Sequence, residues 1–191
     1  MKLDEIVENL KKHELEFDLA IKNAGRTRNL IFKERRKLKT VEKVKALIIE
    51  VGQKTQKDVN GYIENSVTLA LQSVFGKEFS FRIRQEIKRD QPEVHFDFGE
   101  NDLFFDPKED EVAGGRIDIA AFALKVIDWS LSFPQSVSVL FLDEPFKNVS
   151  KEYKTKALQL LKEVCKSKNM QIIMVTHIPE FVAGADNIIE L

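Results

Sequence analysis

Two apolar runs near the end of the chain constrain its fold more than any other feature. The first covers residues 137–142 and ends in Asp143-Glu144-Pro145-Phe146, and the second covers Ile172–Val175 and ends in Thr176-His177. Each run has the length and the β-branched content of a parallel strand that is buried on both faces. Open α/β sheets bind ligands at the carboxyl ends of such strands. We therefore expect the acidic pair and the histidine to belong to one site.

The segments around these runs alternate between strand and helix. We expect a strand at 136–142, a helix at about 150–167, a strand at 171–175, a short helix from Pro179 and a last strand at 187–191. This alternation predicts parallel pairing with right-handed crossovers. Earlier in the chain, residues 79–105 alternate apolar and polar side chains, which is typical of half-buried antiparallel strands. A helix with one apolar face follows Gly114-Gly115.

The first seventy-odd residues contain no proline and predict a long helix. Side chains that are apolar except for Thr55 recur every seven residues in two series, one from Leu3 to Ala24 and one from Val41 to Leu69. Such series favour a coiled coil, and an amphipathic helix on a globular core is the alternative. Residues 23–28, between the series, are a candidate break or helical hairpin. We expect a helical or coiled-coil segment over 1–75 and an α/β lobe over 76–191.

Composition excludes some classes of protein. The net charge of −1 argues neither for nor against a nucleic-acid partner. The longest apolar stretches are far shorter than the roughly 20 residues of a membrane span, so no membrane partner is expected. The amino terminus lacks the form of a secretion signal, and one cysteine, Cys165, fits a reducing compartment. We expect a cytoplasmic protein.

Positive charge is concentrated in residues 22–45, where ten Lys or Arg residues face only two Glu. This patch could neutralise phosphates on DNA, or it could be the solvated face of a coiled coil. The sequence leaves both interpretations open. The candidate DNA contacts are Arg26, Arg28, Lys33, Arg35, Arg36, Lys37 and Lys39.

The residues after the two apolar runs suit phosphate chemistry. Asp143 is predicted to hold Mg²⁺, a hard ion that prefers oxygen ligands. Glu144 can accept a proton from an attacking water or orient it. His177 can donate to a terminal phosphate oxygen. Each residue also has an ordinary structural interpretation, such as a helix cap or a satisfied histidine, which their combination makes less favourable.

The start of the next helix upstream offers a second candidate site. Gly114 and Gly115 present bare amides at a positive helix end, which suits an anion, although ordinary turns also use glycine pairs. Arg116 could reach a phosphate or face water. Asp118 is expected to interact with the helix dipole rather than to take part in chemistry.

Taken in order, four motifs resemble the carboxyl-terminal lobe of an ABC-type ATPase head: Ala113-Gly114-Gly115, Val139–Glu144, Lys147–Ser150 and Thr176-His177. With a coiled coil entering from the amino side, the chain resembles the SMC and SbcC-like proteins of chromosome maintenance and double-strand-break repair. Among these it is most similar to phage-type DNA-repair ATPases. The resemblance implies an α/β fold: an antiparallel β-meander and a parallel sheet with helices, preceded by a long coiled-coil segment.

In that family two heads sandwich ATP. The resemblance implies ATP and Mg²⁺ as cofactors, with Asp143, Glu144 and His177 acting in cis. It also implies that residues of the opposite head contact ATP in trans, and the matching positions here are Gly114, Gly115, Arg116, Asn148 and Ser150. Dimeric heads, DNA and a nuclease subunit are the partners that follow.

The chain departs from the family pattern in three places. Ala113 replaces the signature serine, and Ser150 replaces the aspartate that normally ends its loop. The phosphate loop, Gly-x-x-x-x-Gly-Lys-Ser/Thr, is missing. Two hypotheses follow. The chain docks with a separate amino-terminal phosphate-loop lobe to form a DNA-repair or recombination ATPase head, or it is a non-hydrolysing interaction or regulatory module that binds a complete head or DNA.

Overall fold

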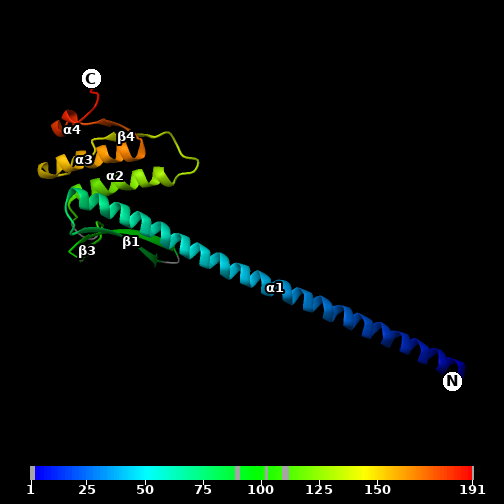
Figure 1. Ribbon diagram of the computed structural model, residues 1–191. Helices are drawn as coiled ribbons and strands as arrows, with labels where there is room; N and C mark the ends of the chain where they lie inside the picture. Colours follow the sequence, from blue (N-terminus) through cyan, green and yellow to red (C-terminus); the bar gives the residue numbers. More distant parts are fainter. Residues whose placement is uncertain (1–2, 89–90, 102, 109–111, 191) are drawn as a thin grey trace. The chain divides into compact units, whose positions relative to one another are not determined.

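The computed structural model describes residues 3–88, 91–101, 103–108 and 112–190 (Figure 1). The elements are α1 (Leu3–Val74), β1 (Phe79–Lys88), β2 (Gln91–Glu100), β3 (Leu103–Phe105), α2 (Gly114–Leu131), β4 (Val139–Asp143), α3 (Lys151–Lys168), β5 (Gln171–Val175) and α4 (Pro179–Ala183). A long helix precedes an antiparallel three-stranded sheet and a parallel pair. The predicted fold class is confirmed.

Contacts group the chain into two compact units, Met1–Gln56 and Lys57–Leu191. Helix α1 contributes to both units, and its last turns, from Lys57 on, belong to the unit that contains the sheets. The division into domains at residues 75 and 76 stays a prediction.

Helix α1 runs without a break from Leu3 to Val74 (Figure 1). The break or hairpin predicted at residues 23–28 is therefore wrong. Gly25 lowers helix stability by about 1 kcal/mol relative to alanine, and Asn23 by less. Helix propagation is cooperative, so a long helix tolerates two such residues.

Because α1 is continuous, the two series with seven-residue spacing form one stripe along the helix. Val41 follows Ala24 by seventeen residues, which is two heptads and three residues. The first series therefore occupies the a positions of a heptad frame and the second the d positions. Leu10, Leu38 and Ile48 on this stripe are 63%, 59% and 65% exposed. Such a stripe is the seam along which a second helix packs in a coiled coil.

The meander β1-β2-β3 is antiparallel, with Phe81 opposite Phe98 and Phe98 opposite Phe105. Phe79, Phe81 and Phe98 are buried. They lie in one core with Val67 and Leu71 from the end of α1. The period-two pattern of residues 79–105 therefore predicted this sheet correctly, but not the burial of β2. Val94 and Phe96 are 47% and 43% exposed, whereas His95 and Asp97 on the opposite face are buried.

Helix α1 also covers the free edge of β1. Its side chains at four-residue spacing hydrogen-bond the backbone of alternate strand residues: Glu64 Oε1 accepts from Ile83 N at 2.7 Å, Thr68 Oγ1 accepts from Phe81 N at 2.9 Å, and Gln72 Nε2 donates to Phe79 O at 3.0 Å. Four helical residues rise about 6 Å and two strand residues advance about 6.7 Å, so the two spacings nearly match. An edge satisfied in this way is not available to another strand.

Helix α2 supplies a large share of the core through Ile119, Ala120, Phe122, Ala123, Val126 and Ile127. Phe146, in the turn after β4, packs edge-to-face against Phe122 of α2 and Phe181 of α4, with ring centroids 5.5 and 5.8 Å away. Aromatic contacts of this geometry contribute beyond their buried area. They fix the turn after β4 to two helices.

Strands β4 and β5 pair in parallel, with Leu142 opposite Met174 and Asp143 opposite Val175. The prediction that both faces are buried is wrong. Leu142 packs in the core, whereas Phe141, Ile173 and Val175 on the other face are 71%, 44% and 63% exposed. The continuous apolar character of the two runs therefore includes a face that no other part of the described chain covers.

The helices after β4 lie where the sequence predicts them, and the last predicted strand does not form. Residues 187–190 are neither helix nor strand, and Leu191 lies outside the described residues. Ile188 and Ile189 are 58% and 86% exposed. A strand needs a neighbour, and in the described chain the parallel sheet has two strands. No helix in the described ranges is both long enough and apolar enough for a membrane span.

Candidate functional site

The carboxyl ends of β4 and β5 bring Glu144 and His177 together, as parallel pairing predicts. The Glu144 amide donates to the Val175 carbonyl at 2.8 Å and extends the ladder by one residue. His177 Nδ1 lies 3.1 Å from Glu144 Oε1. The side chains are 75% and 44% exposed, respectively. The pair is therefore accessible to a ligand.

The turn that presents Glu144 has an uncommon backbone. Glu144 and Phe146 have φ angles of 41° and 61°, in the left-handed region. A residue other than glycine pays about 1–2 kcal/mol for this conformation, so the surroundings must hold it. Phe146 and Val149 do so from within the core, where they are 2% and 3% exposed.

Asp143 ends β4 on the same face as Phe141, since alternate strand residues share a face. Its side chain is exposed. No group of three or more His, Cys, Asp or Glu side chains in the described ranges is arranged to hold a metal ion. Mg²⁺ commonly uses one or two protein carboxylates, with water and phosphate oxygens completing its shell. Asp143 fits the role of such a single protein ligand.

Gly114 and Gly115 lie against the loop that follows the β4 turn. A Cβ on Gly114 would lie 3.0 Å from Asn148 Cβ. A Cβ on Gly115 would lie 3.0 Å from the Asn148 carbonyl oxygen and from Val149 Cα, which are backbone atoms. The glycine pair thus permits a close approach, and a Cβ at either position would require the loop to shift. Its role as an anion seat stays a prediction.

Asp118 joins α2 to the same loop. Its Oδ2 accepts a hydrogen bond from Asn148 N at 3.0 Å, and its Oδ1 accepts one from Asn148 Nδ2 at 3.2 Å. Asn148, predicted to contact ATP, is therefore also an anchor of its own loop. The sequence signal for this contact was weak, because the two residues are thirty positions apart.

Arg116 and Ser150, also predicted to contact ATP in trans, have different surroundings. Arg116 Nη1 forms an ion pair with Glu100 Oε2 at 2.9 Å, and its guanidinium lies 4.4 Å from the centroid of the Phe79 ring. Ser150 is the exposed N-cap residue of α3, without a side-chain capping hydrogen bond. Arg116 is engaged within the chain, and Ser150 is accessible.

The seven candidate DNA contacts all lie on α1 within the unit Met1–Gln56, and all are exposed. Lys37 Nζ pairs with Glu34 Oε1 at 2.8 Å, and the Arg36 guanidinium lies 5.0 Å from the centroid of the Phe32 ring. Exposed pairs of this kind add little to stability. Their charges remain accessible to an external partner.

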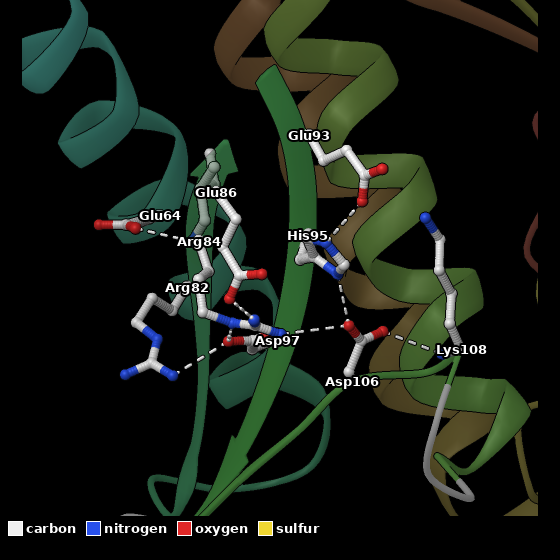
Figure 2. A network of polar contacts seen from close by, with 10 residues as sticks. Glu64, Arg82, Arg84, Glu86, Glu93, His95, Asp97, Asp106 and Lys108 are labelled. Atoms are coloured by element: carbon white, nitrogen blue, oxygen red, sulfur yellow. Dashed lines mark hydrogen bonds and ion pairs between the residues drawn. The ribbon is translucent and has the colours of Figure 1, made fainter. Parts of the chain in front are cut away.

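A buried polar network on the meander was not predicted (Figure 2). Arg84 Nε donates to Asp97 Oδ2 at 3.0 Å, and Arg84 Nη2 donates to Asp106 Oδ2 at 3.2 Å. His95 Nδ1 lies 2.7 Å from the same Asp106 oxygen. His95, Asp97 and Asp106 are 9%, 2% and 6% exposed. Charged residues at every second position of β1 and β2 were the signal that could have revealed it.

The network shifts the pKa values of its members. Burial of Asp97 opposes its ionisation, but hydrogen bonds from Arg84 and Arg82 outweigh burial and lower its pKa. A hydrogen bond from the Lys108 amide, followed by one from His95, lowers the pKa of Asp106. Hydrogen bonds to Asp97 and Glu86 raise the pKa of Arg84. The network is a structural feature of the meander, which is a different sheet from β4 and β5.

The chain matches no protein-family model, and no curated protein matches it. Solved structures of SMC head domains share its fold. One comes from work on the ATP-driven dimerization and DNA-stimulated activation of SMC ATPases, with a TM-score of 0.53 and 14% identity over 74% of this chain and 80% of that chain. Another is an Smc head bound to the C-terminal winged-helix domain of ScpA, with a TM-score of 0.52 and 17% identity over 66% of this chain and 37% of that one.

A third structure includes a coiled coil. It is an Smc head domain with an extended coiled coil, bound to the C-terminal domain of ScpA derived from Pyrococcus furiosus. The TM-score is 0.50 with 18% identity, over 96% of this chain and 48% of that chain. This chain therefore spans less than half the length of two of the three structures. At these identities the likeness establishes the fold.

Proposed function

We propose that the chain is the carboxyl-terminal part of an SMC-like ATPase head, and that a separate phosphate-loop lobe completes its ATP site. The observation that carries the proposal is the accessible Glu144–His177 pair, 3.1 Å apart at the carboxyl ends of two parallel strands. The fold shared with SMC heads supports it.

The uncovered face of β4 and β5 is a second support. Phe141, Ile173 and Val175 form an exposed apolar patch on a sheet of two strands. Parallel sheets occur almost entirely with both faces covered, and they usually have more strands. The phosphate-loop lobe is the occupant we propose for this face. It would lie next to Asp143, which is on the same side of β4.

Glu144, His177 and Asp143 each have a different role in the proposed hydrolysis of ATP. Glu144 orients the attacking water or accepts its proton. His177 donates a hydrogen bond to a terminal phosphate oxygen. Asp143 would hold Mg²⁺, which would supply positive charge that stabilises the phosphate oxygens. Because Glu144 and His177 are in contact, they act at one point of the substrate.

A second head would meet the surface formed by Gly114, Asn148 and Ser150, next to the buried Gly115. Bare amides and the positive end of α2 suit the phosphates of a nucleotide held by the opposite head. Arg116 joins this surface only by releasing Glu100. Dimeric heads are therefore part of the proposal. We also propose that the head belongs to the SbcC-like branch that repairs double-strand breaks, and that phage-type repair ATPases are the group nearest to it. A nuclease subunit is a further proposed partner.

Coexpression tests the assembly. The chain is produced together with a candidate phosphate-loop lobe, and the complex is isolated. The complex should bind ATP in the presence of Mg²⁺, and the chain alone should bind it much more weakly. Absence of a complex, or equal ATP binding by the isolated chain, contradicts the proposal.

A second function, DNA binding by α1, is favoured by the distribution of charge around the helix. Positions b, c and f of the heptad frame face away from the seam. Between residues 22 and 43 these positions carry six cations and no acid: Lys22, Arg26, Lys33, Arg36, Lys39 and Lys43. The two acids of this segment, Glu34 and Glu42, lie at d and e. The outer face therefore presents unopposed positive charge, which suits a phosphate backbone.

The frame divides the candidate DNA contacts into two groups. Arg28, Arg35 and Lys37 lie at e and g, beside the seam, where a second helix would partly cover them. Replacing Arg26, Lys33 and Arg36 with Gln should weaken binding to a short duplex and flatten its salt dependence by up to about 3 units of slope. The matched triple change at Arg28, Arg35 and Lys37 should do less. Equal effects contradict the outer-face assignment.

This second function also fits a chain that binds DNA, or caps a complete head, without turnover. ATP hydrolysis by the assembled head separates that alternative from the first proposal. Retained DNA binding without hydrolysis favours the interaction module.

A further inference from the structure

The turn from Glu144 to Val149 is held at three points. At its start, the Glu144 amide is bound to the Val175 carbonyl at 2.8 Å. In its middle, the buried Phe146 ring lies against Phe122 and Phe181. The backbone is left-handed at both of these points, Glu144 and Phe146. Such a turn keeps its shape only while its surroundings hold it.

The third point is Asp118. Both of its carboxylate oxygens are used on one residue, with Asn148 N at 3.0 Å and Asn148 Nδ2 at 3.2 Å. Gly114 and Gly115 allow the loop to come this close, because a Cβ on either would lie 3.0 Å from loop atoms. A hydrogen bond to a carboxylate is stronger than a hydrogen bond between two neutral groups, and Asp118 accepts two.

Asp118 does not cap the amino-terminal end of α2. The helix has no side-chain capping hydrogen bond, and Ala113 occupies its N-cap position. The expectation that Asp118 interacts chiefly with the helix dipole therefore does not describe its contacts. Its carboxylate is directed at the loop.

We propose that Asp118 is a positioning residue for Glu144. By holding Asn148, it closes the far end of the turn and so keeps the Glu144 carboxylate opposite His177. The inference rests on the proposed role of Glu144 in hydrolysis. Asp118 does not touch the reacting atoms. Its effect is on the position of the Glu144 carboxylate, which does.

The first test uses the chain alone and needs no ATP. The chain has three histidines, so the imidazole NMR resonances can be assigned by substitution. Glu144→Gln removes the carboxylate next to His177 and provides the reference shift. Asp118→Ala should move the His177 resonance, and Asp118→Asn, which keeps one acceptor oxygen, should move it less.

Two controls separate positioning from a general loss of structure. Asp128→Ala removes the same charge from an exposed site of the same helix, and it should leave His177 unmoved. The resonance of His95, which is buried in the meander, should be unchanged in every variant. An unmoved His177 resonance in Asp118→Ala overturns the proposal. So does an equal shift in Asp128→Ala.

The second test uses the assembled head. Asp118→Ala should lower kcat about ten- to a hundredfold, the scale of a misplaced catalytic group, with little change in KM for ATP. Asp118→Asn should recover part of the loss. Unchanged kcat in an active head overturns the inference. If the wild-type head does not hydrolyse ATP, the proposed function fails, and the His177 resonance alone decides the role of Asp118.

Discussion

His177 and Glu144 are 33 residues apart in the sequence, yet His177 Nδ1 lies 3.1 Å from Glu144 Oε1. The register of β4 and β5 produces this contact. Asp143 is directly opposite Val175, so the residues that follow the two strands lie at the same edge of the sheet. The pair therefore depends on a sheet that has two strands, and an uncovered outer face, in the part of the chain that the structure describes. The phosphate-loop lobe that we propose for this face would therefore also support the site.

Phe141→Ser tests the role of the uncovered face. Because the Phe141 side chain is 71% exposed, the change should alter the free energy of unfolding by no more than about 0.5 kcal/mol. It should weaken binding to the phosphate-loop lobe. Thermal melts and binding titrations measure the two effects. Phe133→Ser is the control, since Phe133 is 99% exposed outside the sheet. Equal weakening by both changes contradicts the assignment.

Gly115→Ala and Gly25→Ala form a matched pair. The new Cβ at Gly115 meets backbone atoms at 3.0 Å, so this change should lower the free energy of unfolding by about 1–3 kcal/mol. At Gly25 a Cβ meets nothing within 4 Å, and alanine should stabilise α1 by up to about 1 kcal/mol. Urea unfolding monitored by circular dichroism measures both. A tolerated Gly115→Ala would show that α2 and the loop are not tightly packed.

Glu64→Ala tests the contact between α1 and the edge of β1. The Ile83 amide loses its acceptor at 2.7 Å, so its hydrogen exchange should become faster. The free energy of unfolding should fall by about 1 kcal/mol, the usual net value of a hydrogen bond. Asn65→Ala, at the exposed neighbouring position, should change neither quantity. Unchanged exchange at Ile83 would mean that α1 does not protect this edge.

Acid should destabilise the meander through Asp97 and Asp106. Both carboxyl groups have native pKa values below 3.8, their ordinary value. The unfolded chain therefore takes up protons first, and the stabilisation is complete above pH 3.8 and is lost as the pH falls through the native pKa values. Urea unfolding from pH 6 downward measures this fall. Asp97→Asn should lower stability at neutral pH and flatten the acid limb, and an equally steep limb in that variant contradicts the assignment.

Local sequence patterns predicted the parts of the fold that depend on local rules. The period of two in residues 79–105 predicted the meander, and the apolar runs predicted β4 and β5. Because parallel strands end at one edge, the run boundaries also predicted that Glu144 and His177 meet. That contact needed no knowledge of the rest of the core.

The remaining features depend on contacts that a pattern does not contain. An apolar run does not say whether its cover belongs to the same chain, and for that reason the exposure of Phe141 was missed. Asn23 and Gly25 indicate a break, but the cooperativity of a long helix outweighs their propensities. The hydrogen bonds from Asn148 to Asp118 join distant segments and follow only from the packed loop.

The most direct measurement is the ATPase rate of the assembled head with Glu144→Gln. This change keeps the size of the side chain and removes its ability to accept a proton, so turnover should fall at least about a hundredfold while the complex and its ATP binding persist. The wild-type head should hydrolyse ATP only with Mg²⁺. If the Glu144→Gln head hydrolyses ATP as fast as the wild type, the role we propose for the Glu144–His177 pair is wrong.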